Sequence, residues 1–191
     1  MAQNKTQAQP KAKSTPKDRS KNPMRRISVG KITLNFCAGA NQALLEKGIK
    51  LIKMVSGKEP LKTNSTKRIP TWNIRPGLPI GCKQTLRGEA ANKLLLQLLK
   101  GVENKLSPKS FDSQGNFSFG VKEYIDVPGL RYDPEIGILG FDVAVSLVRP
   151  GYRIMRRRRL TSPISSTHRI SKDDAIVFVK DKFGAKIGED E

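Results

Sequence analysis

Two segments of the chain alternate apolar and polar residues, which is the period of a β-strand with one buried and one open face. They are residues 27–36, ISVGKITLNF, and residues 81–87, GCKQTLR. The apolar faces can pack on helices, whereas the polar faces would lie together on the open side of a sheet. The polar positions combine cations with short hydrogen-bonding side chains: Lys31, Thr33, Asn35, Lys83, Thr85 and Arg87.

Apolar residues at helical spacing predict three helices. The first covers residues 41–57 and ends at Gly57, and the last begins at Ser171 and ends at Gly184, so both have typical cap residues. The strongest pattern covers residues 89–106. Its apolar stripe consists of Ala91, Leu95, Leu98, Val102 and Leu106.

Further strands are predicted at residues 61–63, in the segment NFSFGV and over residues 137–149. In the last of these, apolar residues fall on both faces, which is typical of a central strand that is buried on both sides. Three residues outside the alternating strands are interpreted as core positions, and these are Met54, Phe117 and Phe119.

This order of elements predicts an α+β domain with a mostly antiparallel sheet and helices packed on one face. Residues 64–80 are polar and contain several prolines, so they are predicted to form a long projecting loop. Residues 1–23 have no large apolar residue except Met1 and are expected to form a disordered basic leader. Residues 24–184 would then be a single domain, and residues 185–191 a flexible tail.

Charge indicates what kind of partner the chain binds. Its 191 residues include 36 Lys and Arg against 17 Asp and Glu, a formal net charge of +19. Self-repulsion of this size favours binding to a polyanion, so we expect nucleic acid first and an anionic membrane second. No apolar run approaches the roughly 18 residues of a membrane span, and the N-terminal residues lack the apolar segment of a signal peptide. Residues 103–142 differ, with seven acidic and four basic side chains, which suggests a second, basic partner.

Residue types that support catalysis or metal binding are scarce. Cys37 and Cys82 are the only cysteines and form no CxxC pair, which excludes a disulfide scaffold or zinc knuckle and fits a reducing cytosol. His168 is the only histidine, and its polar surroundings favour a solvated or phosphate-contacting residue. We therefore expect no enzyme activity, metal, cofactor or small-molecule substrate. Four carboxylates without metal-loop spacing are interpreted as a recognition surface: Glu123, Asp126, Asp133 and Glu135.

The polar sheet face and the long loop both suit RNA. On the sheet face, cations can neutralise phosphates while Thr and Asn side chains reach sugar hydroxyls and base edges; an ordinary solvated face is the alternative. The loop holds the only tryptophan, Trp72, and an aromatic ring among cations suits stacking on a base. Packing of Trp72 into the core is the alternative. The cations of the loop are Lys67, Arg68 and Arg75.

A third cationic segment follows the strand predicted at residues 137–149. Residues 149–172 contain eight basic side chains and no acidic one, so a solvated face of this kind would repel itself. We expect these arginines to contact phosphates of rRNA: Arg149, Arg153, Arg156, Arg157, Arg158, Arg159 and Arg169.

Several segments resemble large-subunit ribosomal protein five, the universal 5S-rRNA-binding family, in its archaeal and eukaryotic branch. The strings RPGLPIG-x-K-x-TLRG and YDPEIGI-x-GFD carry the resemblance, together with NPMRRISVGKITLNFCAG and VRPGYRIMRRRR. The similarity covers residues 22–184. It implies a structural protein of the cytoplasmic ribosome, of archaeal type, that binds 5S rRNA and large-subunit rRNA and helps attach 5S rRNA in the central protuberance.

The resemblance also implies roles for individual positions. Asn35, Thr85 and Arg87 match family positions that contact 5S rRNA, and Lys58 stands where the family has Gln in the turn after the first helix. The acidic region 107–142 would touch a small-subunit head protein across an intersubunit bridge. The loop at residues 66–79 would approach the elbow of P-site tRNA through Lys67, Arg68, Trp72, Asn73 and Arg75.

Two other classes of function remain as alternatives. An RNA-processing enzyme would need a base, nucleophile, metal cluster or cofactor loop, and the sequence contains none of these patterns. A basic nucleic-acid-binding protein outside the ribosome, of the chromatin or RNA-chaperone type, shares the charge. Co-sedimentation with ribosomal subunits at high salt would distinguish this second alternative.

Overall fold

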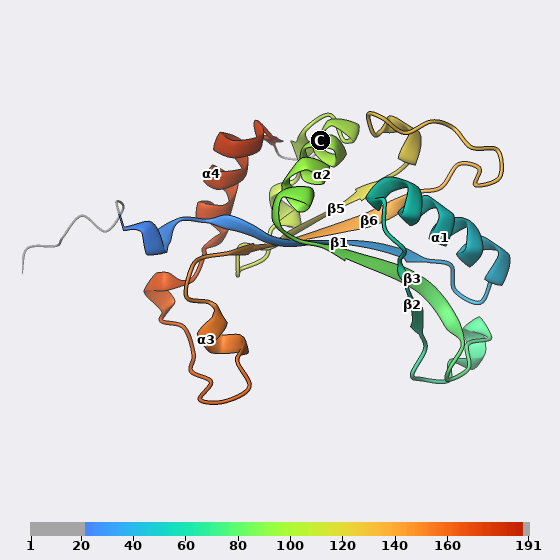
Figure 1. Ribbon diagram of the computed structural model, residues 1–191, viewed down its shortest axis with the longest axis horizontal. Coiled ribbons are helices and arrows are strands. Elements are labelled where there is room, and N and C mark those ends of the chain that lie inside the picture. The colour runs from blue at the N-terminus through green and yellow to red at the C-terminus, as the bar shows by residue number, and fades with distance from the viewer. Residues whose placement is uncertain (1–21, 189–191) are drawn as a thin grey trace, which may run out of the picture.

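The alternating segments form a five-stranded antiparallel sheet with the strand order β2-β3-β1-β6-β5. This computed structural model describes residues 22–188 (Figure 1). The predicted α+β class and mostly antiparallel sheet are confirmed. The strands of the sheet are β1 (Ser28–Cys37), β2 (Leu61–Asn64), β3 (Pro79–Leu86), β5 (Phe117–Val121) and β6 (Phe141–Val148).

Two helices, α1 (Gln42–Ser56) and α2 (Gly88–Gly101), cover one face of the sheet and pack against β1, with α1 also packed on β3 (Figure 1). Helix α1 begins where the Asn41 side chain accepts a hydrogen bond from the Leu44 N–H, at 3.2 Å. It ends at Gly57, whose φ of 66° is the left-handed conformation that glycine adopts without strain. Both ends of this helix therefore follow from cap residues in the sequence.

Helix α1 approaches β1 closely at Gly48, which is buried in the helix. A β-carbon on Gly48 would lie 2.1 Å from the Phe36 ring, far inside contact distance. Glycine at this position lets the helix lie directly on the buried face of β1, where Ile32 and Leu34 are fully buried. Met54 lies on the other side of α1 and is 39% exposed, so its interpretation as a core residue was wrong.

Helix α2 ends at Gly101, short of the predicted end at residue 106. Glu103 and Asn104 have φ values of 52° and 56°, which turn the chain away from the helix axis. A β-carbon on Gly101 would lie 3.1 Å from the Val127 side chain, so the helix end is also held by a tertiary contact. Leu106 is buried from the short strand β4 (Lys105–Leu106) instead. Its helical spacing was a coincidence.

Strand β6 has one buried and one open face, which corrects the prediction of burial on both sides. It is internal to the sheet, between β1 and β5, but helices cover only one face. Asp142 and Ala144 are exposed on the other face. The buried positions are Phe141, Val143, Val145 and Leu147. In the neighbouring strand, Phe117 is buried and Phe119 packs half-buried against the core, which confirms their interpretation.

The C-terminal helix α4 (Lys172–Phe183) begins with a capping box, in which the Asp174 N–H donates to Ser171 Oγ at 3.1 Å. It ends at Gly184, as predicted. Beyond it, β7 (Lys186–Ile187) pairs in parallel with β4. Residues 185–188 thus belong to the folded domain, where the sequence predicted a flexible tail.

The predicted leader lies outside the described residues except for its last two positions. There, the Asn22 side chain accepts a hydrogen bond from the Met24 N–H at 2.9 Å and begins a 3₁₀ turn at Pro23–Arg25. The described part of the leader is therefore joined to the domain through a short capped turn.

We predict that Gly48→Ala destabilises the protein by about 1–3 kcal/mol, because the added methyl overlaps the Phe36 ring. Alanine is the better helix former, so a propensity argument alone predicts the opposite sign. Urea unfolding measures the difference. Lys47→Ala, at the exposed neighbouring position, is the matched control and should change stability by less than about 0.5 kcal/mol. A Gly48→Ala protein as stable as the control would contradict the close contact.

Candidate nucleic-acid interface

The sheet face opposite α1 and α2, here called the open face, is lined by polar side chains. Strand pairing places Thr33 opposite Thr85 and Asn35 opposite Lys83, and directly opposed residues share a face. The Thr33 and Thr85 hydroxyl oxygens lie 3.5 Å apart. Lys31 lies on the same face of β1, and Arg87 follows the end of β3 as the cap residue of α2. The structure therefore brings the predicted sheet-face residues together.

Strand β6 extends the open face with residues that the sequence did not assign to it. Asp142 pairs with Asn35, Ala144 with Thr33, and Ser146 with Lys31. These positions were missed because the apolar neighbours in β6 suggested burial on both sides. The alternation of Asp142, Ala144 and Ser146 was the signal that could have identified them. Asp142 also places one carboxylate among the cations of this face.

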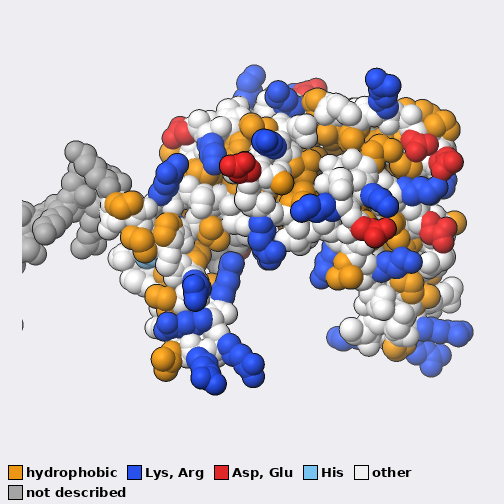
Figure 2. Space-filling view, viewed as in Figure 1, with side chains coloured by type: hydrophobic (Ala, Val, Ile, Leu, Met, Phe, Trp, Pro, Cys, Tyr) orange, Lys and Arg blue, Asp and Glu red, His pale blue; other side chains and the backbone are white. Residues whose placement is uncertain are grey.

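Two projections flank the open face. One is the β2–β3 loop (residues 65–78), and the other is the arginine arm (residues 149–170), which contains the short helix α3 (Arg153–Arg156). Figure 2 shows the molecule hollowed between these two projections, with Lys and Arg side chains gathered on both. Cations thus flank the open face on two sides, and further Lys and Arg side chains lie on the helix-covered side of the molecule.

The β2–β3 loop is closed at its base and exposes its aromatic residue. The Ser65 N–H donates to the Leu78 carbonyl at 2.8 Å, and Ile69 and Ile74 form a further bridge. Ile74 is buried and anchors the loop, whereas Trp72 is 67% exposed. The alternative in which Trp72 packs into the core is therefore wrong. The other residues predicted to contact tRNA are also exposed, and these are Lys67, Arg68, Asn73 and Arg75.

Most of the predicted phosphate contacts on the arginine arm are accessible. The arm is braced from within, because the Tyr152 hydroxyl accepts a hydrogen bond from the Ile170 N–H at 2.9 Å. His168 Nε2 donates to the Pro150 carbonyl at 2.9 Å, which gives this histidine a bracing role. The exposed arginines are Arg153, Arg156, Arg157, Arg158, Arg159 and Arg169.

Arg149 is an exception and was misassigned as a phosphate contact. Its residue surface is only 6% exposed, and its guanidinium forms an ion pair with Asp174 at 2.9 Å. It also donates to the carbonyls of His168 and Arg169, at 3.3 and 3.0 Å. These contacts join the end of β6 to the start of α4. Arg149 therefore has a structural role, because its two terminal nitrogens, Nη1 and Nη2, donate to groups inside the protein, while its buried Nε has no partner among the described residues.

Lys58 lies in the turn between α1 and the edge strand β2, and its side chain is exposed. It directly follows the left-handed Gly57 that ends α1. The structure thus places Lys58 at the edge of the sheet, apart from the paired rows of the open face. An RNA that covers the open face and continues past β2 could reach this cation.

The acidic region, residues 107–142, presents its carboxylates at the surface. Glu123, Asp126 and Glu135 are exposed, and Asp133 is half-buried. Glu135 accepts from Lys50 Nζ at 2.6 Å, and this hydrogen bond together with the ammonium charge lowers the pKa of the Glu135 carboxyl. Both side chains are exposed, so the pair contributes little to stability.

Two kinds of feature are not found in residues 22–188: a cluster of metal-ligating side chains and a membrane-spanning helix. No cluster of three or more His, Cys, Asp or Glu side chains in this part of the chain could hold a metal ion. None of its helices has the length and apolar character needed to cross a bilayer.

Comparison with known proteins identifies related sequences over most of the chain. A family model described as Ribosomal protein L5 matches residues 22–75, and a second model, for the C-terminus of the same ribosomal family, matches residues 79–178. Large ribosomal subunit protein uL5 of Nanoarchaeum equitans is 45% identical over 166 residues, covering 86% of this chain and 98% of that protein. The uL5 proteins of Sulfolobus acidocaldarius and Methanobrevibacter smithii are 44% and 41% identical over 90% and 85% of this chain, and over 96% and 95% of their own lengths.

We predict that Arg149→Ala destabilises the protein by about 2–3 kcal/mol, because two backbone carbonyls and the Asp174 carboxylate lose their buried donor. Arg153→Ala removes an exposed arginine from the same arm and should cost less than about 0.5 kcal/mol. Equal unfolding midpoints in urea for the two variants would contradict the structural role of Arg149.

The two cysteines should differ strongly in reactivity. Cys37 is exposed, whereas Cys82 is fully buried and burial raises the pKa of its thiol to about 11. At pH 7–8 the Cys82 thiolate is therefore scarce, and we expect iodoacetamide to label it at least about a hundredfold more slowly than Cys37. Peptide mass spectrometry after timed labelling measures both rates. Guanidinium chloride, which unfolds the chain, should make them equal, and equal rates without denaturant would contradict the buried position of Cys82.

Proposed function

The chain belongs to the ribosomal protein L5 family, and we propose that this structural, non-enzymatic constituent of the large ribosomal subunit binds 5S rRNA through the open face of its sheet. As in its family, its place of action is the ribosome in the cytoplasm. One observation carries the proposal. The sheet leaves a row of paired polar side chains uncovered by helices, between two cationic projections (Figure 2).

The side chains of the open face suit an irregular RNA surface. Lys31, Lys83 and Arg87 can neutralise phosphates, while the hydroxyl and amide groups of Thr33, Thr85 and Asn35 can bond to 2′-hydroxyls and base edges. Asp142 repels phosphate and can accept hydrogen bonds from base amino groups or 2′-hydroxyls. The RNA backbone would therefore pass beside Asp142, with sugars or bases directed at the centre of the face. Lys58 would extend this contact at the sheet edge.

The arginine arm would bind phosphates of large-subunit rRNA. Residues 149–172 contain no Asp or Glu that could offset the charge of these arginines. A bound polyanion would neutralise them and so remove their mutual repulsion. Binding of this kind releases counterions and weakens steeply with salt. The arm and the open face would together hold 5S rRNA against the body of the subunit and help attach it in the central protuberance.

We further propose that the β2–β3 loop contacts P-site tRNA. The loop projects beyond the open face at the edge of the sheet (Figure 1), and its base is fixed by backbone hydrogen bonds. Trp72 is available to stack on a sugar or base, and the loop cations are available to phosphates. Such contacts read shape and charge without reading sequence.

The acidic region would contact a small-subunit head protein across the subunit interface. Its exposed carboxylates are combined with exposed apolar side chains, Ile125, Tyr132 and Ile138. Apolar groups surrounded by acids suit a basic protein partner, because the charges steer the encounter and the apolar groups supply contact area.

The double variant Asn35→Ala/Arg87→Ala should bind 5S rRNA more weakly, because each lost contact costs about 1–3 kcal/mol. Filter binding at fixed salt measures the loss, and circular dichroism checks the fold. Lys93→Ala, a lysine on α2 away from the open face, is the control and should retain nearly full affinity. Unchanged affinity in the folded double variant would exclude the open face as the 5S site.

Replacing Lys67, Arg68 and Arg75 together by alanine should leave 5S rRNA affinity within about threefold, since the loop cations lie outside the open face. In assembled ribosomes the same variant should reduce chemical protection of P-site tRNA. A large loss of 5S affinity with intact tRNA protection would assign the loop to 5S rRNA instead.

A further inference from the structure

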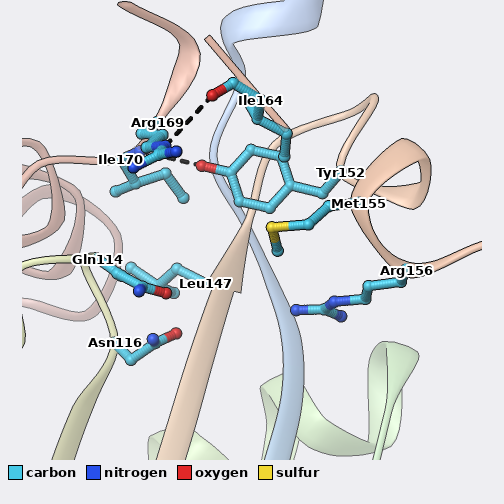
Figure 3. A pocket seen from close by; sticks show the side chains of 9 residues that line it. All are labelled: Gln114, Asn116, Leu147, Tyr152, Met155, Arg156, Ile164, Arg169 and Ile170. Atoms are coloured by element: carbon cyan, nitrogen blue, oxygen red, sulfur yellow. Dashed lines mark hydrogen bonds between the residues drawn. The ribbon is translucent and has the colours of Figure 1, made fainter. Parts of the chain in front are cut away.

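A cavity of about 150 Å³ opens between the arginine arm and the turn that precedes β5 (Figure 3). Its residues come from three separate parts of the chain, so it exists only in the folded domain. The open face and the β2–β3 loop do not contribute to it. The lining residues are Gln114, Asn116, Leu147, Tyr152, Met155, Arg156, Ile164, Arg169 and Ile170.

The walls of this pocket divide into an apolar part and a polar part. Leu147 and Ile170 are buried and form an apolar wall, to which Tyr152 and Met155 add a ring and a thioether. The Tyr152 ring is fixed, because its hydroxyl accepts a hydrogen bond from the Ile170 N–H at 2.9 Å. Figure 3 shows the Asn116 amide and the Arg156 guanidinium directed into the pocket from opposite sides.

We propose that this pocket binds a single unpaired nucleobase of ribosomal RNA. A cavity of about 150 Å³ is large enough for one six-membered aromatic ring. The apolar walls match the faces of a base, and the amides of Gln114 and Asn116 supply both donors and acceptors for its edge. This inference rests on the proposed RNA-binding function of the arginine arm.

The charge around the pocket favours a nucleotide of an RNA chain over a neutral ligand. Arg156 and Arg169 lie at the pocket, and Arg157, Arg158 and Arg159 continue along the same arm. A base held in the pocket would place its own phosphate beside Arg156, and the flanking phosphates would follow the exposed arginines. Unpaired bases are the parts of RNA that proteins bind in this manner, because a paired base has no free edge and face.

The test is a titration of the full chain with AMP and with UMP, followed by the side-chain amide resonances of Gln114 and Asn116 in ¹H–¹⁵N spectra. Ribose 5-phosphate, which has the sugar and phosphate but no base, is the control ligand. We expect saturable shifts with UMP, whose base is a single six-membered ring as the cavity requires, and an affinity for ribose 5-phosphate at least about tenfold lower. Equal responses to nucleotide and to ribose 5-phosphate would show that the pocket binds only phosphate. No response to either nucleotide would show that the pocket binds no base. Each of these two results would overturn the proposal.

Two variants localise the effect. Met155→Trp fills the pocket from an exposed position, and Asn116→Ala removes one amide; each should lower nucleotide affinity by about tenfold while the circular dichroism spectrum is retained. Lys93→Ala, at an exposed position of α2 outside the lining, should leave the preference for nucleotide over ribose 5-phosphate unchanged. Loss of that preference in Lys93→Ala but not in Met155→Trp would overturn the assignment. This titration uses mononucleotides and reports on the pocket alone. A pocket that does not bind a base can therefore be distinguished from an arm or an open face that does not bind RNA.

Discussion

The surfaces proposed to bind RNA depend on the contact between α1 and the buried face of β1. Side chains of a strand alternate between two faces, so fixing Ile32, Leu34 and Phe36 beneath the helix also fixes the polar residues between them on the other side. Gly48 brings the helix down onto the Phe36 ring. A shift of one residue in register would exchange the two sets and place cations in the core. The same packing that stabilises the fold therefore orients the open face.

The distribution of charge follows a different constraint. A net charge of +19 destabilises a compact chain through repulsion, and the exposed ion pairs, such as Lys50–Glu135, compensate little of it. Six exposed arginines lie on a projecting arm, where solvent and counterions screen them in the free protein. Arg149 shows the contrasting case, since its burial is compatible with folding only because Asp174 and two carbonyls surround it.

Sequence patterns predicted correctly those elements whose structure depends on neighbouring residues. The alternation in β1 and β3, the cap at Ser171 and the glycines that end α1 and α4 were all recognisable in the sequence. The errors arose where distant residues decide. Helix α2 stops at Gly101, where the end of the helix packs against the distant Val127 and the chain turns away at Glu103 and Asn104. Arg149 is buried by a helix that begins over twenty residues later, and the open side of β6 depends on which face the helices cover. The roles of the surface residues toward RNA come from chemistry and resemblance, and periodicity contains no information on them.

The parallel pairing of β4 with β7 has a consequence for synthesis of the chain. The two strands are separated by about eighty residues, yet they join the end of α2 to the last described segment. During translation the chain leaves the ribosome from its N-terminus, so β4 waits without its partner until nearly all of the domain has emerged. Helix α4, which precedes β7, can complete the core only at this late stage. The strands of the open face, which end by residue 148, therefore emerge before α4 and β7, and the β4–β7 pair is among the last parts of the domain to form.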